Sequence, residues 1–200
     1  GGIARLRVYG EVLREWSAGE ASLEDFALSR NGGVALAWSN AHYGLPRNCL
    51  APAPSERMDQ GWETARNPQR PAILEAGSDG LVDCGYAFDW FVMKLGARCE
   101  LEEIEIDTSH FKGNFPESCL IEGLDDEKLW SLPALEQMQH FSDPEQLSKP
   151  WQKVMSRVRC GPHERKTFKL ESASPTTHLK VTIYPDGGIA RIRARGRLSI

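Results

Sequence analysis

The sequence predicts an all-β protein built as a β-sandwich. Short segments in which apolar and polar side chains alternate recur along the chain, as they do in strands with one buried face. Turn-forming residues separate these segments, since the 200 residues include 18 glycines and 12 prolines. Helical spacing is confined to Leu132–Phe141 and a short stretch at Leu23–Leu28. Many short strands with few helices favour antiparallel sheets packed face to face.

Length, composition and charge limit the classes of protein to which the chain can belong. The 200 residues suffice for one domain with a sizeable core, and 40% hydrophobic with 26% charged residues is ordinary for a soluble domain. The net charge of −4 gives no reason to expect nucleic acid or a membrane as partner. No apolar run is long enough to cross a bilayer, and the amino end lacks a secretory signal. Five cysteines without a CxxC spacing indicate reduced thiols in an intracellular protein.

An internal repeat predicts the domain organisation. GGIARLRVYG at Gly1–Gly10 nearly repeats GGIARIRARG at Gly187–Gly196, and a repeat of that period indicates a duplicated domain. We therefore interpret residues 1–10 as the last strand of a preceding homologous domain. Residues 11–30 are expected to be a linker, and residues 31–200 the second domain.

The elements of this domain follow in order. Gly33–Ser39 alternates weakly and predicts the first strand, and Asn40–Asp59 is rich in proline and therefore irregular. Asn67–Gly85 is longer than an ordinary connection and is either a surface loop or a lid. Phe88–Leu95 and Cys99–Thr108 give the clearest strand patterns.

The second half of the domain predicts further strands and a turn. Val154–Arg159 and Thr167–Leu170 are short strand candidates. His178–Tyr184 alternates, the turn sequence PDGG follows, and the next strand puts three arginines on its polar face: Arg191, Arg193 and Arg195. An arginine row of this kind either binds an anion or pairs with acidic residues on a neighbouring strand, and Glu103 and Glu105 suit the second interpretation.

The most informative stretch is IEIDTSHFKGNFPESCLIEG, residues Ile104–Gly123. Its first part alternates as a half-buried strand, and then His110, Lys112 and Asn114 occur within five residues before Ser118–Ile121 returns as a strand. Polar loops that leave a strand end commonly carry functional residues. The plain alternative is a hairpin loop whose histidine and lysine are merely solvated.

IDTSHFKGNFPESC resembles the IDT-x-HFKGN-x-PE signature of allantoicases, which hydrolyse allantoate to ureidoglycolate and urea in purine breakdown. Three further segments resemble this family in the same order: GWET at Gly61–Thr64, FDWFVMKLG at Phe88–Gly96 and the closing hairpin at His178–Gly196. The chain departs from the family's GWETRR at Ala65, which stands in the place of one arginine.

The resemblance implies a fold, a location and partners. The fold would be a jelly-roll β-sandwich of the galactose-binding type, one copy of a tandem duplicated domain. The expected partners are allantoate as substrate, the homologous preceding repeat and further copies of the chain in a homo-oligomer, with neither nucleic acid nor membrane. The location would be cytoplasmic or peroxisomal. This single domain is not expected to suffice for activity if the site needs both repeats.

Hydrolysis of allantoate requires an acid, a base and anchors for a carboxylate. We expect His110, Glu63 and Asp107 to be catalytic, with Asp107 orienting the histidine. Lys112, Asn114 and Arg66 are the expected substrate-binding residues. Each could instead be structural: Glu63 could brace its own loop, and Asp107 could bond turn amides.

No cofactor is indicated by the sequence. The histidines show no HxH, HxxxH or DxH spacing, so no metal residue is assigned, although a loosely bound divalent ion stays open. The alternative function is a non-catalytic ligand- or sugar-binding module, because a jelly-roll fold does not fix function. Acid–base residues in the HFKGN loop favour the hydrolase.

Overall fold

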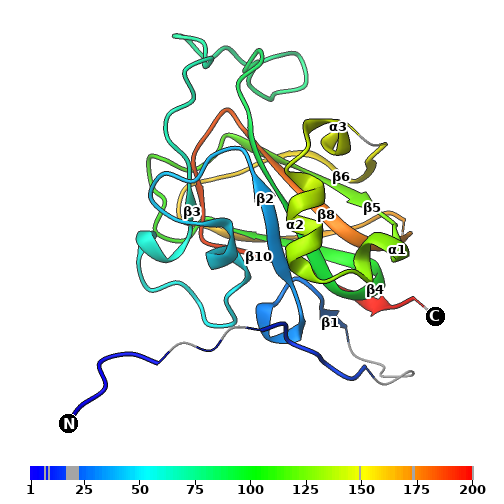
Figure 1. The fold of residues 1–200 in the computed structure, drawn as a ribbon. Helices are drawn as coiled ribbons and strands as arrows, with labels where there is room; N and C mark the ends of the chain where they lie inside the picture. Colours follow the sequence, from blue (N-terminus) through cyan, green and yellow to red (C-terminus); the bar gives the residue numbers. More distant parts are fainter. Residues whose placement is uncertain (7, 9, 17–22, 149, 173, 200) are drawn as a thin grey trace.

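The computed structural model describes the whole chain except residues 7, 9, 17–22, 149, 173 and 200. Antiparallel strands form the body, and three short helices lie on one side of it (Figure 1). The strands are β1 (Glu24–Asp25), β2 (Val34–Trp38), β3 (Trp62–Glu63), β4 (Asp89–Asp107), β5 (Ser118–Leu124), β6 (Gln152–Arg159), β7 (Arg165–Lys169), β8 (Pro175–Tyr184), β9 (Gly188–Ile189) and β10 (Arg191–Leu198). The helices are α1 (Glu127–Trp130), α2 (Ala134–Phe141) and α3 (Pro144–Leu147), with 3₁₀ turns at Ser29–Asn31, Pro46–Leu50 and Met58–Gln60.

The 19-residue strand β4 organises the sandwich. Its first half pairs with β2 and β8, and its second half pairs with β10 and β7. The sequence predicted two strands here, and the structure has one that continues through Gly96. The Gly96 N–H donates to Phe26 O at 2.9 Å, and an added Cβ would lie 2.0 Å from Asn31 O. Gly96 therefore lets a neighbouring segment approach the backbone of β4 closely, and it does not end the strand.

The core fills with side chains from the predicted apolar positions. Ile104 and Ile106 of β4 are buried, while Glu103 and Glu105 beside them are partly exposed, as the alternation predicted. The inward face of β8 is likewise fully buried, and it comprises Leu179, Val181 and Ile183. Because these side chains come from strands that β4 joins, one continuous core supports the loops at both ends of the sandwich.

The prediction of a closing hairpin was wrong, because its two strands do not pair with each other. The strands before and after the PDGG turn form as β8 and β10, but the sheet order β1–β10–β4–β8–β5–β6 places β4 between them. The long strand β4 offers separate backbone edges along its two halves, so each strand finds its partner there. The turn thus carries the chain across the end of the sandwich, where β9 pairs with β3.

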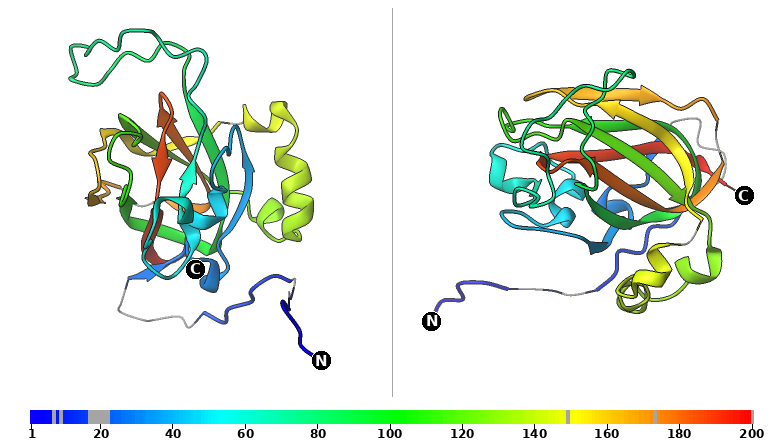
Figure 2. Two further views of the ribbon diagram at one scale, coloured as in Figure 1. Left: turned by 90° about the vertical axis from the view of Figure 1, so that its left-hand side faces the viewer. Right: turned by 90° about the horizontal axis from the view of Figure 1, so that it is seen from above.

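The helical excursion covers the outer face of β2 and β4 (Figure 2). Leu129 of α1 and Phe141 of α2 pack with Leu36 and Val92 in a second, smaller core. The prediction of a helix at Leu132–Phe141 is confirmed by α2. A helix at Leu23–Leu28 was wrong, because this segment pairs with β10 as β1 and buries Phe26.

The amino-terminal residues lie outside the sandwich. Residues 1–6, 8 and 10 run away from the body, are exposed and form no strand (Figure 1); the rest of the expected strand at residues 1–10 lies outside the described residues. Part of the expected linker, residues 17–22, does as well. The described parts contact the domain: Trp16 stacks on Phe26 at 4.7 Å, and Glu11 pairs with Lys94 at 3.5 Å.

Two further sequence expectations concern the cysteines and the long loop. All five cysteines are free, as predicted, and all are buried. The segment between β3 and β4 projects from one end of the sandwich as an irregular loop (Figure 2). No helix in the described part of the chain is long and apolar enough to span a membrane.

Candidate active site

Two loops that lie far apart in the sequence meet at one end of the sandwich. Asn114, in the loop between β4 and β5, donates from Nδ2 to Glu63 Oε1 at 2.5 Å and to Met58 Sδ at 3.2 Å. Glu63 ends β3, which is held by β9 on one side and by a bridge to Gly44 on the other. The structure thus joins two of the segments from which the sequence analysis drew its candidate residues.

Glu63 has a buried carboxylate of which one oxygen accepts a hydrogen bond. Its residue is 7% exposed, and Oε2 has no hydrogen-bond partner among the described residues. Asn114 occupies the other oxygen, so the carboxylate has a fixed orientation. Oε2 is itself enclosed, so it is a free hydrogen-bond acceptor for a group that comes to lie beside it.

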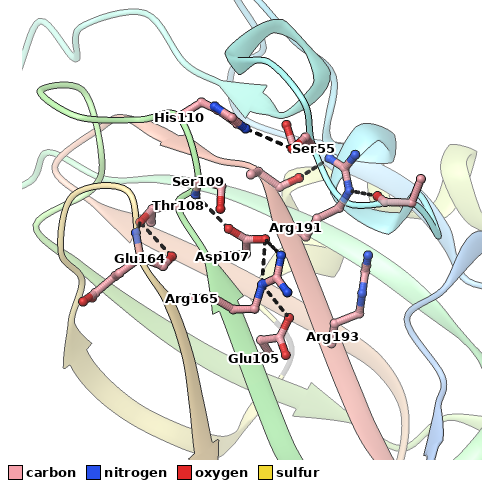
Figure 3. A network of polar contacts seen from close by, with 12 residues as sticks. Ser55, Glu105, Asp107, Thr108, Ser109, His110, Glu164, Arg165, Arg191 and Arg193 are labelled. Carbon is pink, nitrogen blue, oxygen red and sulfur yellow. Dashed lines mark hydrogen bonds and ion pairs between the residues drawn. The ribbon is translucent and has the colours of Figure 1, made fainter.

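His110 follows β4 with a left-handed backbone conformation, φ 73°. Its Nε2 lies 2.9 Å from Ser55 O, and its backbone N–H donates to His163 Nδ1 at 2.7 Å. Figure 3 shows the ring directed toward Ser55. Because a carbonyl oxygen only accepts, this contact places the proton on Nε2 and leaves Nδ1 able to accept another.

Asp107 is enclosed at the end of β4, with 1% exposed. Its Oδ1 accepts the Ser109 N–H at 2.8 Å, and its Oδ2 pairs with Arg165 at 3.2 Å (Figure 3). None of the hydrogen bonds found among the described residues joins it to His110. Lys112 and Arg66, by contrast, are exposed side chains at the rim of the two loops.

The predicted arginine row divides into two environments. Arg195 pairs with Glu105 at 2.9 Å, as predicted. For Arg191 and Arg193 the pairing with the acidic row was wrong, because residues 49–60 cover both side chains and supply backbone carbonyls for their donors. Burial lowers the pKa of both guanidinium groups, and their donors are in use, so neither side chain is available to an anion.

A cavity of about 400 Å³ opens beside Asn114. Sequence reasoning missed its charged lining: Arg70, Glu117, Arg159 and Asp186. The available signals were the acidic residue that closes the PE signature and the aspartate in the PDGG turn. The two arginines have no such signal, because one lies in an irregular loop and the other ends an ordinary strand.

The comparisons with known proteins agree with these motifs. Residues 24–199 match the family model of the allantoicase repeat. The chain belongs to the allantoicase family. It is 36% identical over 202 residues to proteins named probable allantoicase from two strains of Pseudomonas fluorescens, SBW25 and Pf0-1. These alignments cover 100% of this chain and 53% of each relative, so the chain spans about half the length of the curated relatives it matches.

Solved structures confirm the jelly-roll prediction. The crystal structure of allantoicase from Saccharomyces cerevisiae matches with a TM-score of 0.66 and 30% identity, over 87% of this chain and 43% of that one. A CBM32 domain from Clostridium perfringens, solved with GalNAc-β-1,3-galactose, matches with a TM-score of 0.53 at 12% identity, over 86% of this chain and 99% of that one. At that identity the second likeness shows the fold alone, so the sugar-binding alternative gains no support from it.

Proposed function

We propose that the protein hydrolyses allantoate to ureidoglycolate and urea, as one repeat of an allantoicase in purine catabolism. The observation that carries the proposal is the hydrogen bond between Asn114 and Glu63, because it joins the two segments that carry the family signatures. Family membership supplies the substrate class, since relatives that cover the whole chain are named probable allantoicase.

The proposal includes a homologous repeat before this one. Three apolar residues in the first copy of the GGIAR motif are each at least 85% exposed, whereas the aligned residues of the second copy are fully buried. The length of the relatives is in keeping with two repeats. Assembly into a homo-oligomer and a cytoplasmic or peroxisomal location belong to the same proposal.

The residues at the end of the sandwich supply the chemistry in this proposal. Glu63 accepts a proton from the attacking water at its unpaired Oε2, which is enclosed in this structure and is reached when a neighbouring group moves aside, and Asn114 holds its other oxygen. As the C–N bond breaks, the leaving nitrogen takes a proton from Nδ1 of His110 in its imidazolium form, while Glu63 keeps the proton of the water, and solvent restores both groups after urea leaves. Lys112 and Arg66, exposed at the rim, draw the substrate carboxylate toward the site.

Asp107 has a positioning role in this proposal. Its carboxylate bonds the Ser109 N–H and thereby fixes the backbone immediately before His110. Removing that anchor would let the histidine move. If Asp107 only stabilises the turn, its removal would lower stability without any change in the pH profile of turnover.

The test measures urea released from allantoate by the full-length protein. Glu63→Gln and His110→Ala are each expected to lower turnover by about 10²–10⁴-fold, because each removes a proton-transfer group. Lys112→Ala is expected mainly to raise KM. Lys169→Gln, which removes an exposed cation on β7, is the matched control and should change neither constant.

Two outcomes would count against the proposal. A folded wild-type protein that releases no urea from allantoate would rule out the activity. A His110→Ala variant with near-normal turnover would remove the histidine from the chemistry.

A further inference from the structure

The cavity beside Asn114 has the size and setting of a ligand site. Its volume of about 400 Å³ falls in the range of about 300–1,000 Å³ typical of small-molecule pockets. Four segments meet around it: the long loop before β4, the loop between β4 and β5, the end of β6, and the turn between β8 and β9. Four charged side chains line it together with Asn114, namely Arg70, Glu117, Arg159 and Asp186.

Arg70 and Arg159, the two arginines of the lining, have N–H donors that make no hydrogen bond among the described residues. Arg70 donates from Nη1 to Asp186 Oδ1 at 3.0 Å, and its Nε is enclosed without a partner among the described residues. Arg159 Nε lies 3.7 Å from Glu117 Oε1, too far for a hydrogen bond, and its side chain is 66% exposed. Arg191 differs, because it donates to three backbone carbonyls. Because the Arg70 Nε is enclosed, the donors available to a ligand are Arg70 Nη2 and the guanidinium of Arg159, and such donors suit a carboxylate.

The other lining groups are acceptors. Because Asn114 Nδ2 donates to Glu63, its Oδ1 is left to accept an N–H from a ligand. Asp186, only 8% exposed, adds a carboxylate that already orients Arg70. Two positive and two negative side chains balance in the lining. Such a lining suits a molecule with one carboxylate beside N–H-rich neutral groups, and it disfavours a dianion such as phosphate.

We propose that this cavity binds the ureido acid on which the protein acts, with Arg159 and Arg70 on its carboxylate and Asn114 on a ureido N–H. This inference rests on the proposed function and deepens it. The rim cations Lys112 and Arg66 attract the substrate, while the two arginines of the cavity bind it. Asn114 then links the bound ureido group to the proposed base, because its amide also donates to Glu63, which lies behind the cavity lining.

Cys160 also lines the cavity and takes no covalent part. Burial raises the pKa of its thiol to about 12, so it stays protonated near neutral pH. Recognition in the cavity is therefore by charge and hydrogen bonding.

The test compares two inhibitors of urea release by the full-length protein. N-carbamoylglycine carries a ureido group and a carboxylate, and N-carbamoylglycinamide replaces the carboxylate with a neutral amide. The wild type is expected to bind the acid about tenfold or more tightly than the amide. Arg159→Gln should raise the KM for allantoate and the inhibition constant of the acid by on the order of 10–100-fold, and leave the amide unaffected.

The controls separate the role of the arginine from folding. Arg159→Lys keeps the charge and loses the two-pronged contact, so it should recover part of the preference for the acid. Arg70→Gln should act in the same direction as Arg159→Gln. Lys169→Gln should leave both inhibition constants unchanged. Circular dichroism establishes that each variant is folded.

Calorimetric titration with N-carbamoylglycine distinguishes this inference from the proposed function. Arg159-dependent binding in a protein that releases no urea would support the cavity assignment and overturn the activity. Urea release with an unchanged KM and unchanged preference for the acid in folded Arg159→Gln and Arg70→Gln would overturn the cavity assignment alone. Neither urea release nor binding in the wild type would overturn both.

Discussion

Two regions of the molecule share nearly the same ten residues and lie in opposite surroundings. GGIARIRARG at residues 187–196 contains β9 and most of β10, and its apolar side chains are fully buried. The described residues of GGIARLRVYG, 1–6, 8 and 10, are exposed and lie outside the sandwich. The aligned pairs, with exposed fractions, are Ile189 at 0% with Ile3 at 88%, Ile192 at 0% with Leu6 at 85%, and Ala194 at 0% with Val8 at 88%.

The difference shows that the residue pattern of the motif is not enough to bury its apolar side chains. In the second copy, Ile192 lies opposite Ile106 and Arg193 opposite Glu105, so β4 supplies both the backbone partners and the packing surface. The described residues of the first copy have no such strand beside them. The motif therefore specifies a strand that needs a β4-like partner, which a preceding repeat would provide.

The largest expected effect separates the two copies directly. Ile192→Ala should lower the free energy of unfolding by about 2–5 kcal/mol, because it leaves a cavity in the core. Leu6→Ala, at the aligned position, should change it by less than about 0.5 kcal/mol, because the side chain is exposed. Chemical denaturation of the 200-residue chain measures both. Equal losses in the two variants would mean that Leu6 packs on this domain.

Adding the preceding repeat should abolish the asymmetry. In the full-length protein, Leu6→Ala is expected to destabilise by an amount close to that of Ile192→Ala, because Leu6 would then occupy a core position beside its own β4-like strand. A spectroscopic probe placed in the first repeat reports its unfolding by denaturant, and the curves of wild type and variant give the change in its free energy of unfolding. A Leu6→Ala variant as stable as the full-length wild type would contradict the duplicated-strand interpretation.

A smaller effect comes from the glycine that closes each motif. A Cβ added to Gly196 would lie 2.0 Å from Glu100 O of β4, whereas nothing lies within 4 Å of a Cβ added to Gly10. Gly196→Ala should therefore cost about 1–3 kcal/mol, and Gly10→Ala close to nothing in this chain. Thermal or chemical unfolding of the two variants provides the comparison. A harmless Gly196→Ala would show that β4 and β10 can separate at the bulge beside it.

The smallest expected effect is a pH dependence that only the buried copy has. Asp25 accepts the Ala194 N–H at 3.1 Å and lies 3.5 Å from Arg193 Nε. Burial raises the pKa of Asp25 above its ordinary 3.8, against the opposing effects of Ala194 and Arg193. The folded state thus holds this proton more tightly than the unfolded state, and the stabilisation is lost as pH rises through the folded pKa.

The test of that effect is Asp25→Asn. The variant keeps an acceptor for Ala194 and removes the titration, so its free energy of unfolding should decline less steeply than that of the wild type as pH rises from about 4 to 7. Unfolding curves at several pH values give the two slopes. Parallel slopes would show that Asp25 does not contribute to the pH dependence.

Much of the fold could be predicted because local chemistry dictates it. The alternation in β4 and β8, the helical spacing of α2 and the glycine-rich turn after β8 all express constraints within a few residues of each other. The pairing of β8 and β10 could not be predicted in the same way. Adjacent strands usually pair, and here β4, a strand from much earlier in the chain, lies between them.

The residues of the candidate site likewise fall into those that local sequence could indicate and those that only the fold brings together. Glu63, His110 and Asn114 were found because they lie in dense signatures, and the resemblance drew attention to them. Arg70 and Arg159 were not, because each reaches the cavity only through the path of its loop or strand. Arg191 shows the converse error: the sequence marked a row of exposed cations, and the covering segment at residues 49–60 buried it.

By itself, the sequence determined the all-β class, the duplicated motif, the family and the loops that carry the candidate residues. Each of these depends on residue type and on spacing along the chain, which are properties of the sequence. Only the tertiary structure decided which arginines are consumed by backbone carbonyls and which face a cavity. It also decided that Asn114 reaches Glu63, because donors and acceptors find partners by distance in space, and distant segments meet only once the strands have paired.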